Sequence, residues 1–259
     1  MDVEGLSGKA TLETVTDMRR WTDALFSFKT TRPKDYRFSA GQYARLGLPS
    51  GEGILWRAYS IVSAPHEDYL EYYGVLVPGG AFTAILKDIE PGDTLWTDKQ
   101  SFGFMTPERF ADGDDLWMLA TGTGLGPFVS ILRDALVWKK FRRLIVVHCV
   151  KHAAEFGYQE QLLSMRGEHR SDDAELTIIQ CVTREPPTGP LQLTGRITTL
   201  LYDGQLEQAA GIPMTVESSR IMLCGNPEMI EETRRILHQR GMRPCRRALP
   251  GQFVTENYW

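Results

Sequence analysis

The stretch from Trp56 to Ser63 reads W-R-A-Y-S-I-V-S. Its spacing of period two predicts a β-strand, with Arg57 and Tyr59 on one face and Ser60 on the other. The planar cation of Arg57 suits a phosphate group, and the ring of Tyr59 suits the face of a large aromatic system. Ser60 is a small donor that fits a ring nitrogen. The strand therefore offers groups for a pyrophosphate, a ring face and a ring edge. The alternative is an ordinary half-exposed strand with Arg57 and Tyr59 facing solvent.

The first 100 residues contain short segments of strand character, separated by turns rich in proline and glycine. Six strands are predicted, at Ala10–Val15, Leu25–Thr30, Gln42–Leu48, Leu55–Val62, Leu70–Val77 and Thr94–Thr97. A helix is expected at Ala81–Ile89, where two preceding glycines leave backbone N–H groups accessible to an anion. Short strands at this spacing predict an antiparallel β-barrel, which removes exposed sheet edges.

The chain changes character at the polar segment Thr106–Asp115, so we expect one domain at residues 1–106 and a second at 107–259. Continuous apolar runs typical of strands buried on both faces lie at Leu116–Thr121, Leu144–Val150, Leu176–Val182 and Ile221–Cys224. Helical segments alternate with them at Phe128–Lys140, Ala154–Met165 and Glu228–Gln239. This alternation predicts an α/β domain with a doubly wound parallel sheet.

A glycine-rich segment, Gly122-Thr123-Gly124-Leu125-Gly126-Pro127, joins the first apolar strand to the first helix of the second domain. Glycines at such a turn let the backbone approach a pyrophosphate, and the following helix N-terminus stabilises negative charge. The segment reads G-x-G-x-G, so it does not match the general G-x-G-x-x-G dinucleotide fingerprint. A dinucleotide-binding loop is the preferred interpretation, and a plain strand–helix turn is the alternative.

Three cations stand near the ends of these strands. Lys151 and Arg184 follow the second and third apolar runs, and Arg196 opens the next element. An NAD site favours Asp or Glu near the position of Lys151. Cations that converge on one pocket neutralise a 2′-phosphate, so NADP(H) is favoured; the alternative is three solvated surface charges. Cys224 ends the last apolar run, and no neighbouring base supports a nucleophilic role.

The composition is that of a globular protein: 259 residues, 42% hydrophobic, 24% charged, with a formal net charge of −4. This charge gives no reason to expect nucleic-acid or membrane binding, and no apolar run is long enough to span a bilayer. The first nine residues lack the apolar core of a signal peptide. The four cysteines show no C-x-x-C spacing and the five histidines no metal motif, so we expect no iron–sulfur cluster or zinc. We expect a monomer in a reducing cytoplasm.

The ordered set of motifs resembles that of the ferredoxin–NADP(H) reductase family, in its bacterial ferredoxin/flavodoxin–NADP⁺ reductase form. The motifs are R-A-Y-S at 57–60, A-T-G-T-G-L-G-P-F at 120–128, V-T-R-E at 182–185, L-T-G-R at 193–196, C-G-N-P at 224–227 and a terminal Tyr258-Trp259. The family usually has Ala where this chain has Gly126, and commonly Arg where it has Lys151. The resemblance covers nearly the whole chain, and it implies an FAD-binding barrel followed by an NADP(H)-binding domain whose tail returns to the flavin.

The resemblance also implies which residues hold the two cofactors. For FAD they are Arg57, Ala58, Tyr59, Ser60, Tyr73, Val75, Ala81, Phe82, Thr83 and Trp259. For NADP(H) they are Thr121, Gly122, Thr123, Gly124, Lys151, Arg184, Arg196, Cys224 and Gly225. In the implied arrangement Tyr59 and Tyr258 cover opposite faces of the flavin, and Trp259 stacks on the adenine. Ser60 hydrogen-bonds flavin N5, Cys224 stands beside nicotinamide C4, and Glu256 relays a proton.

The implied activity is hydride transfer from NADPH to FAD, followed by release of single electrons to a ferredoxin or a flavodoxin. Basic clusters at Lys139-Lys140 with Arg142-Arg143, and at Arg246-Arg247, are candidates for docking an acidic carrier, with solvated helix ends as the alternative. Two other classes stay open. One is the reductase component of an oxygenase system, although such chains often carry an iron–sulfur domain. The other is a non-enzymatic flavin-binding sensor, which has no need of a nicotinamide-binding half.

Overall fold

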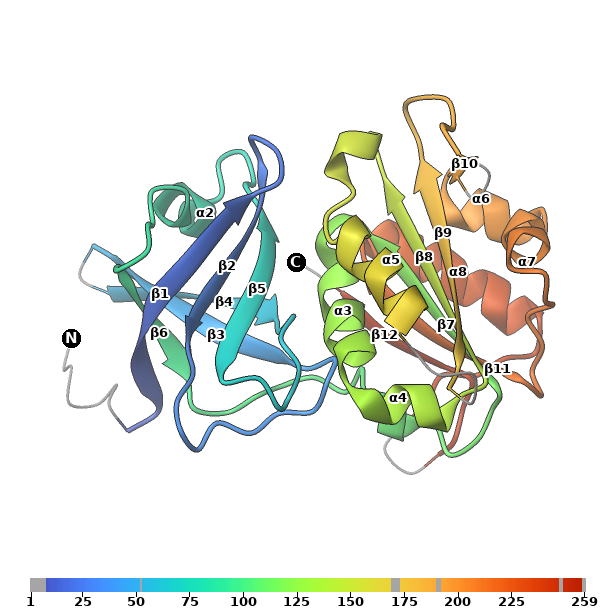
Figure 1. Cartoon of the computed structure of the whole chain (residues 1–259), viewed down its shortest axis with the longest axis horizontal. Helices are drawn as coiled ribbons and strands as arrows, with labels where there is room; N and C mark the ends of the chain where they lie inside the picture. Colours follow the sequence, from blue (N-terminus) through green and yellow to red (C-terminus); the bar gives the residue numbers. More distant parts are fainter. Residues whose placement is uncertain (1–7, 52, 169–172, 190–191, 247–248, 258–259) are drawn as a thin grey trace.

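The computed structural model describes residues 8–51, 53–168, 173–189, 192–246 and 249–257. These residues form two six-stranded sheets that lie side by side, the N-terminal sheet on the left of Figure 1 and the C-terminal sheet with its helices on the right. The predicted two-domain fold class is confirmed. Among the described residues, none of the helices has both the length and the apolar character needed to cross a membrane.

The N-terminal sheet is antiparallel, with the strand order β4-β3-β6-β1-β2-β5. Its strands are β1 (Ala10–Arg20), β2 (Leu25–Thr31), β3 (Tyr43–Ser50), β4 (Gly53–Ser60), β5 (Tyr69–Val75) and β6 (Thr94–Asp98). An antiparallel bridge between Ile61 and Tyr72 joins the chain after β4 to β5, although these strands stand at opposite ends of the order. The sheet therefore curls into a half-barrel. Helix α2 (Ala81–Leu86) adds Phe82 and Leu86 to its apolar core.

The C-terminal sheet is parallel, with the order β10-β9-β8-β7-β11-β12. Its strands are β7 (Asp115–Thr121), β8 (Arg143–Val150), β9 (Glu175–Val182), β10 (Gln192–Thr194), β11 (Ser219–Gly225) and β12 (Phe253–Asn257). One face carries α3 (Gly126–Arg133), α4 (Ala135–Lys140) and α5 (Gln159–Glu168), and the other carries α6 (Ile197–Tyr202), α7 (Gln205–Ala210) and α8 (Pro227–Gln239) (Figure 1). Alternate strand residues supply the two apolar layers: Met118 and Val146 belong to the first, and Trp117 and Ile145 to the second.

Two helix predictions are wrong. The segment Phe128–Lys140 is two helices, because Asp134 has extended backbone angles (φ −85°, ψ 120°) and its side chain caps α4 by accepting the Leu136 N–H at 3.1 Å. The segment Ala154–Met165 is also interrupted. Residues 153–155 form a 3₁₀ turn, η3, and α5 starts only at Gln159, because Tyr158 has a φ of +61° that an α-helix cannot contain.

The sequence pattern also missed several short elements. The strand β12 lies in the C-terminal tail and pairs in parallel with β11, with Phe253 and Val254 buried. Neither β10 nor the helices α6 and α7 were predicted, because none of them exceeds six residues and their periodicity is therefore weak. The pairing of β12 matters for function, because it directs the last described residues of the tail toward the junction between the two domains.

Candidate cofactor site at the domain junction

The R-A-Y-S strand and the glycine-rich loop meet where the two domains touch. Gly126, the last glycine of this loop, is also the first residue of α3. A Cβ built on Gly126 would lie 3.3 Å from Val62 Cγ2, 3.8 Å from Tyr73 Cβ and 3.9 Å from Ser60 Cβ. Two residues predicted to line the flavin are therefore in near contact with the start of the predicted nucleotide-binding helix.

The R-A-Y-S motif lies on β4, an edge strand in which residues 57–60 pair with β3 on one side; among the described strands none pairs with them on the other side, so the outer backbone groups are accessible to a ligand. Arg57 and Ala58 are exposed, and the Arg57 guanidinium donates to the carbonyl of Trp56 at 2.8 Å. The Tyr59 ring is half-buried and lies 5.6 Å from the Phe82 ring, centroid to centroid. Burial raises the pKa of the Tyr59 phenol above its usual range, so the ring presents a neutral face. These features fit a flat, phosphate-bearing cofactor.

The turn before α2 is closed by the buried side chain of Thr83. Its hydroxyl oxygen lies 3.2 Å from the Val77 nitrogen, from which it accepts, and 3.2 Å from the Gly80 oxygen, to which it donates. Gly79 has a φ of +73°, and Ala81, the first residue of the helix, is exposed. The turn is therefore held by Thr83 from the inside, while its outer side is open at the position predicted for the flavin pyrophosphate.

Tyr73 and Val75, also predicted to line the flavin, lie on β5 beside the second domain. Tyr73 is buried, and its ring meets the Tyr158 ring edge to face, with centroids 5.0 Å apart. Val75 is partly buried and packs against the same apolar cluster. Tyr73 thus contributes to the contact between the domains. The structure places only its Cβ near Gly126 and Ser60, and its role toward a flavin stays a prediction.

The loops after β7 and β11 lie backbone to backbone. A Cβ on Gly124 would overlap the Cys224 carbonyl, and a Cβ on Gly225 would overlap the Thr121 hydroxyl. The Thr121 hydroxyl also accepts the Asn226 N–H at 2.7 Å. Gly122 differs from these glycines, because it has a φ of +53° and no atom lies within 4 Å of an added Cβ. The loop is therefore packed on one side and open at Gly122, as a cradle for phosphate requires.

The buried side chain of His148 hydrogen-bonds this loop, and no sequence motif predicted this contact. It lies on β8, is 2% exposed, and its Nε2 is 2.9 Å from the carbonyl oxygen of Gly122. Because a carbonyl only accepts, Nε2 carries the hydrogen in this bond. Burial lowers the pKa of His148 to about 4, so the ring is neutral at physiological pH. The bond joins adjacent strands, a relationship for which the linear sequence contains no motif.

The three predicted cations come together at one edge of the parallel sheet. They follow β8, β9 and β10, which are consecutive neighbours, and the Arg184 N–H donates to the Lys151 carbonyl at 3.0 Å. Gly195, the residue before Arg196, donates its N–H to Val182 at 2.9 Å. All three side chains are exposed, and none of them makes an ion pair with any residue that the structure describes. Such unpaired cations fit a 2′-phosphate.

Cys224 and Glu256 stand side by side on neighbouring strands, β11 and β12. Cys224 is completely buried, and its sulfur lies away from solvent. Glu256 is half-buried and approaches the first domain, since its Oε2 would lie 2.9 Å from a Cβ built on Gly103. Desolvation raises the pKa of Glu256 to about 8, so the carboxyl retains its proton at neutral pH. Tyr258 and Trp259 lie outside the described residues.

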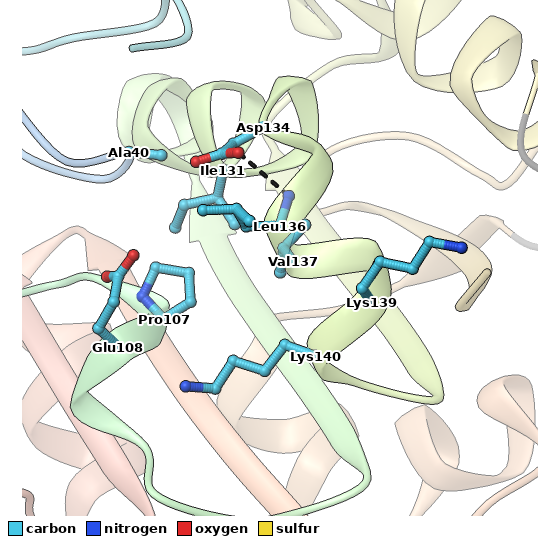
Figure 2. Close-up of a pocket in the computed structure, with 9 residues that line it drawn as sticks. All are labelled: Ala40, Pro107, Glu108, Ile131, Asp134, Leu136, Val137, Lys139 and Lys140. Atoms are coloured by element: carbon cyan, nitrogen blue, oxygen red, sulfur yellow. Dashed lines mark hydrogen bonds between the residues drawn. The ribbon is translucent and has the colours of Figure 1, made fainter.

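A separate hollow of about 330 Å³ is lined by none of the predicted cofactor-site residues. Figure 2 shows it between Pro107 and Glu108 on one side and helix residues Ile131 to Val137 on the other. Lys140 extends along its lower border, whereas Lys139 points away. Its walls are mainly apolar, and it contains neither the glycine-rich loop nor residues of the R-A-Y-S strand.

The basic clusters proposed for carrier docking are already partly neutralised. Lys139 pairs with Asp173 at 2.5 Å, and Arg143 pairs with the buried Asp115 at 2.5 Å. Arg247, predicted as part of the second cluster, lies outside the described residues. Lys139 and Arg143 are therefore held in ion pairs within the second domain, and a docking role for these clusters stays a prediction.

Two family models match the chain, one in each domain. A model described as an oxidoreductase FAD-binding domain matches residues 10–98, and one described as an oxidoreductase NAD-binding domain matches residues 118–235. Together with the open loop and the unpaired cations, these matches define an NADP-dependent oxidoreductase that binds FAD. The chain belongs to the ferredoxin–NADP reductase family.

The similarity between this chain and its relatives extends over nearly the whole length of each. The chain is 39% identical over 246 residues to a flavodoxin/ferredoxin–NADP reductase of Escherichia coli (strain K12), covering 95% of this chain and 97% of the relative. It is 35% identical over 250 residues to a ferredoxin–NADP reductase of Pseudomonas aeruginosa, covering 94% and 95% of the two chains. A crystal structure of a ferredoxin NADP⁺ reductase from Neisseria gonorrhoeae with bound FAD and NADP superposes with a TM-score of 0.90 at 38% identity, covering 97% and 99%.

Proposed function

We propose that this chain is a ferredoxin/flavodoxin–NADP⁺ reductase that passes reducing equivalents between NADPH and a ferredoxin or a flavodoxin. The observation that carries the proposal is the junction at Gly126, where the open glycine loop meets the R-A-Y-S strand. FAD, when bound, supplies the chemistry of accepting a hydride and releasing single electrons. One NADPH therefore serves two one-electron carriers, and the protein supplies orientation, exclusion of water and electrostatics.

The residues proposed to hold FAD lie along β4 and the turn before α2. Arg57 is exposed, and the guanidinium N–H groups not bound to the Trp56 carbonyl can pair with a pyrophosphate oxygen, while Ala58 and the edge of β4 offer backbone groups. Ala81, Phe82 and Thr83 form the helix start beside this position. Tyr59 supplies a ring face, and Tyr258 and Trp259 are proposed to cover the flavin and the adenine from the tail.

The residues proposed to hold NADP(H) divide into two groups. Thr121 to Gly124 and Gly225 form the cradle for the pyrophosphate, where Gly122 leaves open space. Lys151, Arg184 and Arg196 form the cationic edge for the 2′-phosphate. The two groups lie at the carboxyl ends of the same parallel strands, the usual ligand edge of such a sheet. A dinucleotide that spans both groups has its nicotinamide end at the junction with β4.

Three side chains are proposed to act on the reacting atoms. Ser60 is buried beside Gly126 and donates or accepts at the edge of the flavin ring. Cys224, buried at the end of β11, positions the nicotinamide ring by packing against it and not by covalent chemistry. Glu256 holds a proton at its carboxyl group beside Gly103 of the first domain and exchanges it with the flavin or with water.

Anaerobic rapid mixing with NADPH and with NADH tests the proposal. We expect the purified protein to contain flavin, and NADPH to bleach it at least about tenfold faster than NADH. Reduction of a ferredoxin or a flavodoxin in the steady state then separates a carrier reductase from the other two classes. An oxygenase reductase component would reduce dyes but neither carrier, and a sensor would show no NADPH oxidation with ferricyanide. Absence of bound flavin would contradict the assignment of Arg57 to Ser60.

A further inference from the structure

The two domains are joined by a buried polar contact centred on Glu71 of β5. Arg133 is the last residue of α3, and its Nη1 lies 2.6 Å from Glu71 Oε2 and 3.2 Å from the carbonyl oxygen of Val62. The side chains of Arg133 and Glu71 are 13% and 6% exposed. A second Arg133 nitrogen, Nη2, donates to Gln161 at 2.8 Å. The two terminal nitrogens of a guanidinium from the second domain thus bond to groups of the first domain and of α5.

The second carboxylate oxygen of Glu71 also accepts a hydrogen bond from the second domain. The Tyr158 hydroxyl donates to Glu71 Oε1 at 2.8 Å. Tyr158 is buried, and it is the one non-glycine residue of the described chain with a positive φ, at +61°. A strained backbone persists only where the surroundings determine it, and such positions cluster where geometry matters for function. Here the surroundings are the Tyr73 ring and the Glu71 carboxylate, both from the first domain.

Helix α3 connects this polar contact to the nucleotide loop. Gly126, Ser130 and Arg133 are spaced i, i+4 and i+7, so they share one face of the helix. Each touches the first domain: Gly126 near Ser60 and Val62, Ser130 through its hydroxyl to the Ser63 carbonyl at 2.7 Å, and Arg133 at Glu71. Eight helical residues span about 12 Å. Helix α3 is therefore a short, rigid element that begins at the glycine-rich loop and ends at the contact between Arg133 and Glu71.

The first-domain residues that α3 contacts lie next to the strands predicted to bind the flavin. Val62 and Ser63 directly follow the R-A-Y-S motif, and Glu71 stands two residues before Tyr73 on β5. Buried ion pairs contribute little net stability compared with apolar packing, because desolvation offsets their attraction. Their bonds are directional, however, so this pair is suited to select one relative placement of the two domains.

We infer that Glu71, Arg133 and Tyr158 form an interdomain clamp that positions the nicotinamide end of NADPH against the flavin. The inference rests on the proposed function and deepens it. These are positioning residues, since none of them belongs to the proposed cofactor contacts. They act through α3 on the loop at Gly122 to Gly126, and through β5 on the flavin strands. Hydride transfer depends steeply on the approach of the two rings, so a small misalignment lowers the rate without altering either binding site.

The test uses the FAD-loaded full chain and three readouts. The rate of flavin reduction at saturating NADPH depends on the relative placement of the two domains. The flavin content and the reduction of that flavin by dithionite report on the first domain alone. The dissociation constant of 2′-AMP reports the second domain alone. Glu71→Gln should slow NADPH-driven reduction at least about tenfold and leave the other two readouts within about twofold of the parent. Tyr158→Phe removes one hydroxyl with little risk to folding, and should slow the same step about threefold.

Glu207→Gln is the matched control. Glu207 pairs with Arg240 at 3.0 Å, but both residues lie within the second domain, so its loss should leave hydride transfer unchanged. Normal reduction rates in folded Glu71→Gln and Tyr158→Phe would overturn the inference. Equal losses in all three readouts would also overturn it, because they would indicate a general folding defect. If the parent chain itself binds flavin but is not reduced by NADPH, the proposed function fails, and this inference fails with it.

Discussion

The Nε2 of His148 lies 2.9 Å from the carbonyl oxygen of Gly122 and orients the peptide that opens the nucleotide loop. In a trans peptide the C=O and the N–H of the next residue point in opposite directions. With the Gly122 carbonyl turned inward to His148, the Thr123 N–H faces the open side of the loop. The first N–H groups of a helical turn have no partner within it, so this donor is ready for a phosphate oxygen.

We therefore expect His148→Phe to weaken NADP⁺ binding about three- to tenfold, the range for loss of one supporting hydrogen bond. Binding of 2′-AMP should stay unchanged, because that ligand needs the cationic edge and not the pyrophosphate cradle. His148→Gln keeps a donor and should restore part of the affinity. Titration of both ligands by isothermal calorimetry checks this, and equal weakening of the two would contradict it.

The same histidine predicts how stability depends on pH. Its pKa in the folded chain is lowered to about 4 by burial, against an ordinary value of 6.5, so the unfolded chain takes up the proton first as pH falls. The contribution of His148 to the free energy of unfolding is therefore complete above pH 6.5 and declines by up to about 3 kcal/mol as pH falls toward 4. Urea unfolding at pH 7.0 and 4.5 should show a smaller decline in His148→Gln than in the parent.

Glu256 predicts the opposite dependence at higher pH. Its pKa in the folded chain is raised to about 8 by desolvation, so the unfolded chain loses this proton between pH 4.5 and 8 while the folded chain keeps it. The contribution of Glu256 to the free energy of unfolding falls as pH rises through this window. Glu256→Gln should match the parent at pH 4.5 and have the higher unfolding temperature at pH 9. If Glu256 supplies the proton during turnover, the loss of parent activity near pH 8 should be absent from the variant.

The cationic edge predicts cofactor preference. Removal of Arg184 by Arg184→Ala should raise the KM for NADPH about 10- to 100-fold, with little change in kcat and none in the KM for NADH. Lys151→Ala and Arg196→Ala should act in the same direction. Arg234→Ala, which removes a surface arginine paired with Glu231 on α8, is the control and should change neither constant. Equal effects on NADPH and NADH would contradict a role toward the 2′-phosphate.

Two glycine variants separate backbone strain from steric overlap. Gly211 has a φ of +71° with no atom within 4 Å of an added Cβ, so Gly211→Ala should cost about 1 kcal/mol. Gly225 has a φ of +127° and an added Cβ would overlap the Thr121 hydroxyl, so Gly225→Ala should cost about 2 to 4 kcal/mol. The second variant should also weaken NADP⁺ binding, since it displaces the loop at Thr121. Urea unfolding and NADP⁺ titration check both.

Much of the molecule follows from local sequence. The alternation around Arg57 to Ser60 predicts β4, and the apolar runs predict the four central strands of the parallel sheet, because strand burial leaves a periodic signature within a few residues. The glycines at 122 to 126 and the cations after successive strands also predict the two halves of the proposed nucleotide site, since the carboxyl ends of parallel strands share one edge.

The tertiary structure alone decided how these parts meet. Glu71 and Tyr158 are 87 residues apart, and Gly122 and His148 are 26 apart, so no local period links either pair. The break in helix at Tyr158 has no sequence signal either, because its left-handed backbone is imposed by packing against the first domain. The unusual protonation of Glu256 arises in the same way, from desolvation where β12 approaches Gly103. Sequence thus determines the elements and their chemistry, whereas long-range packing and burial determine the alignment on which hydride transfer depends.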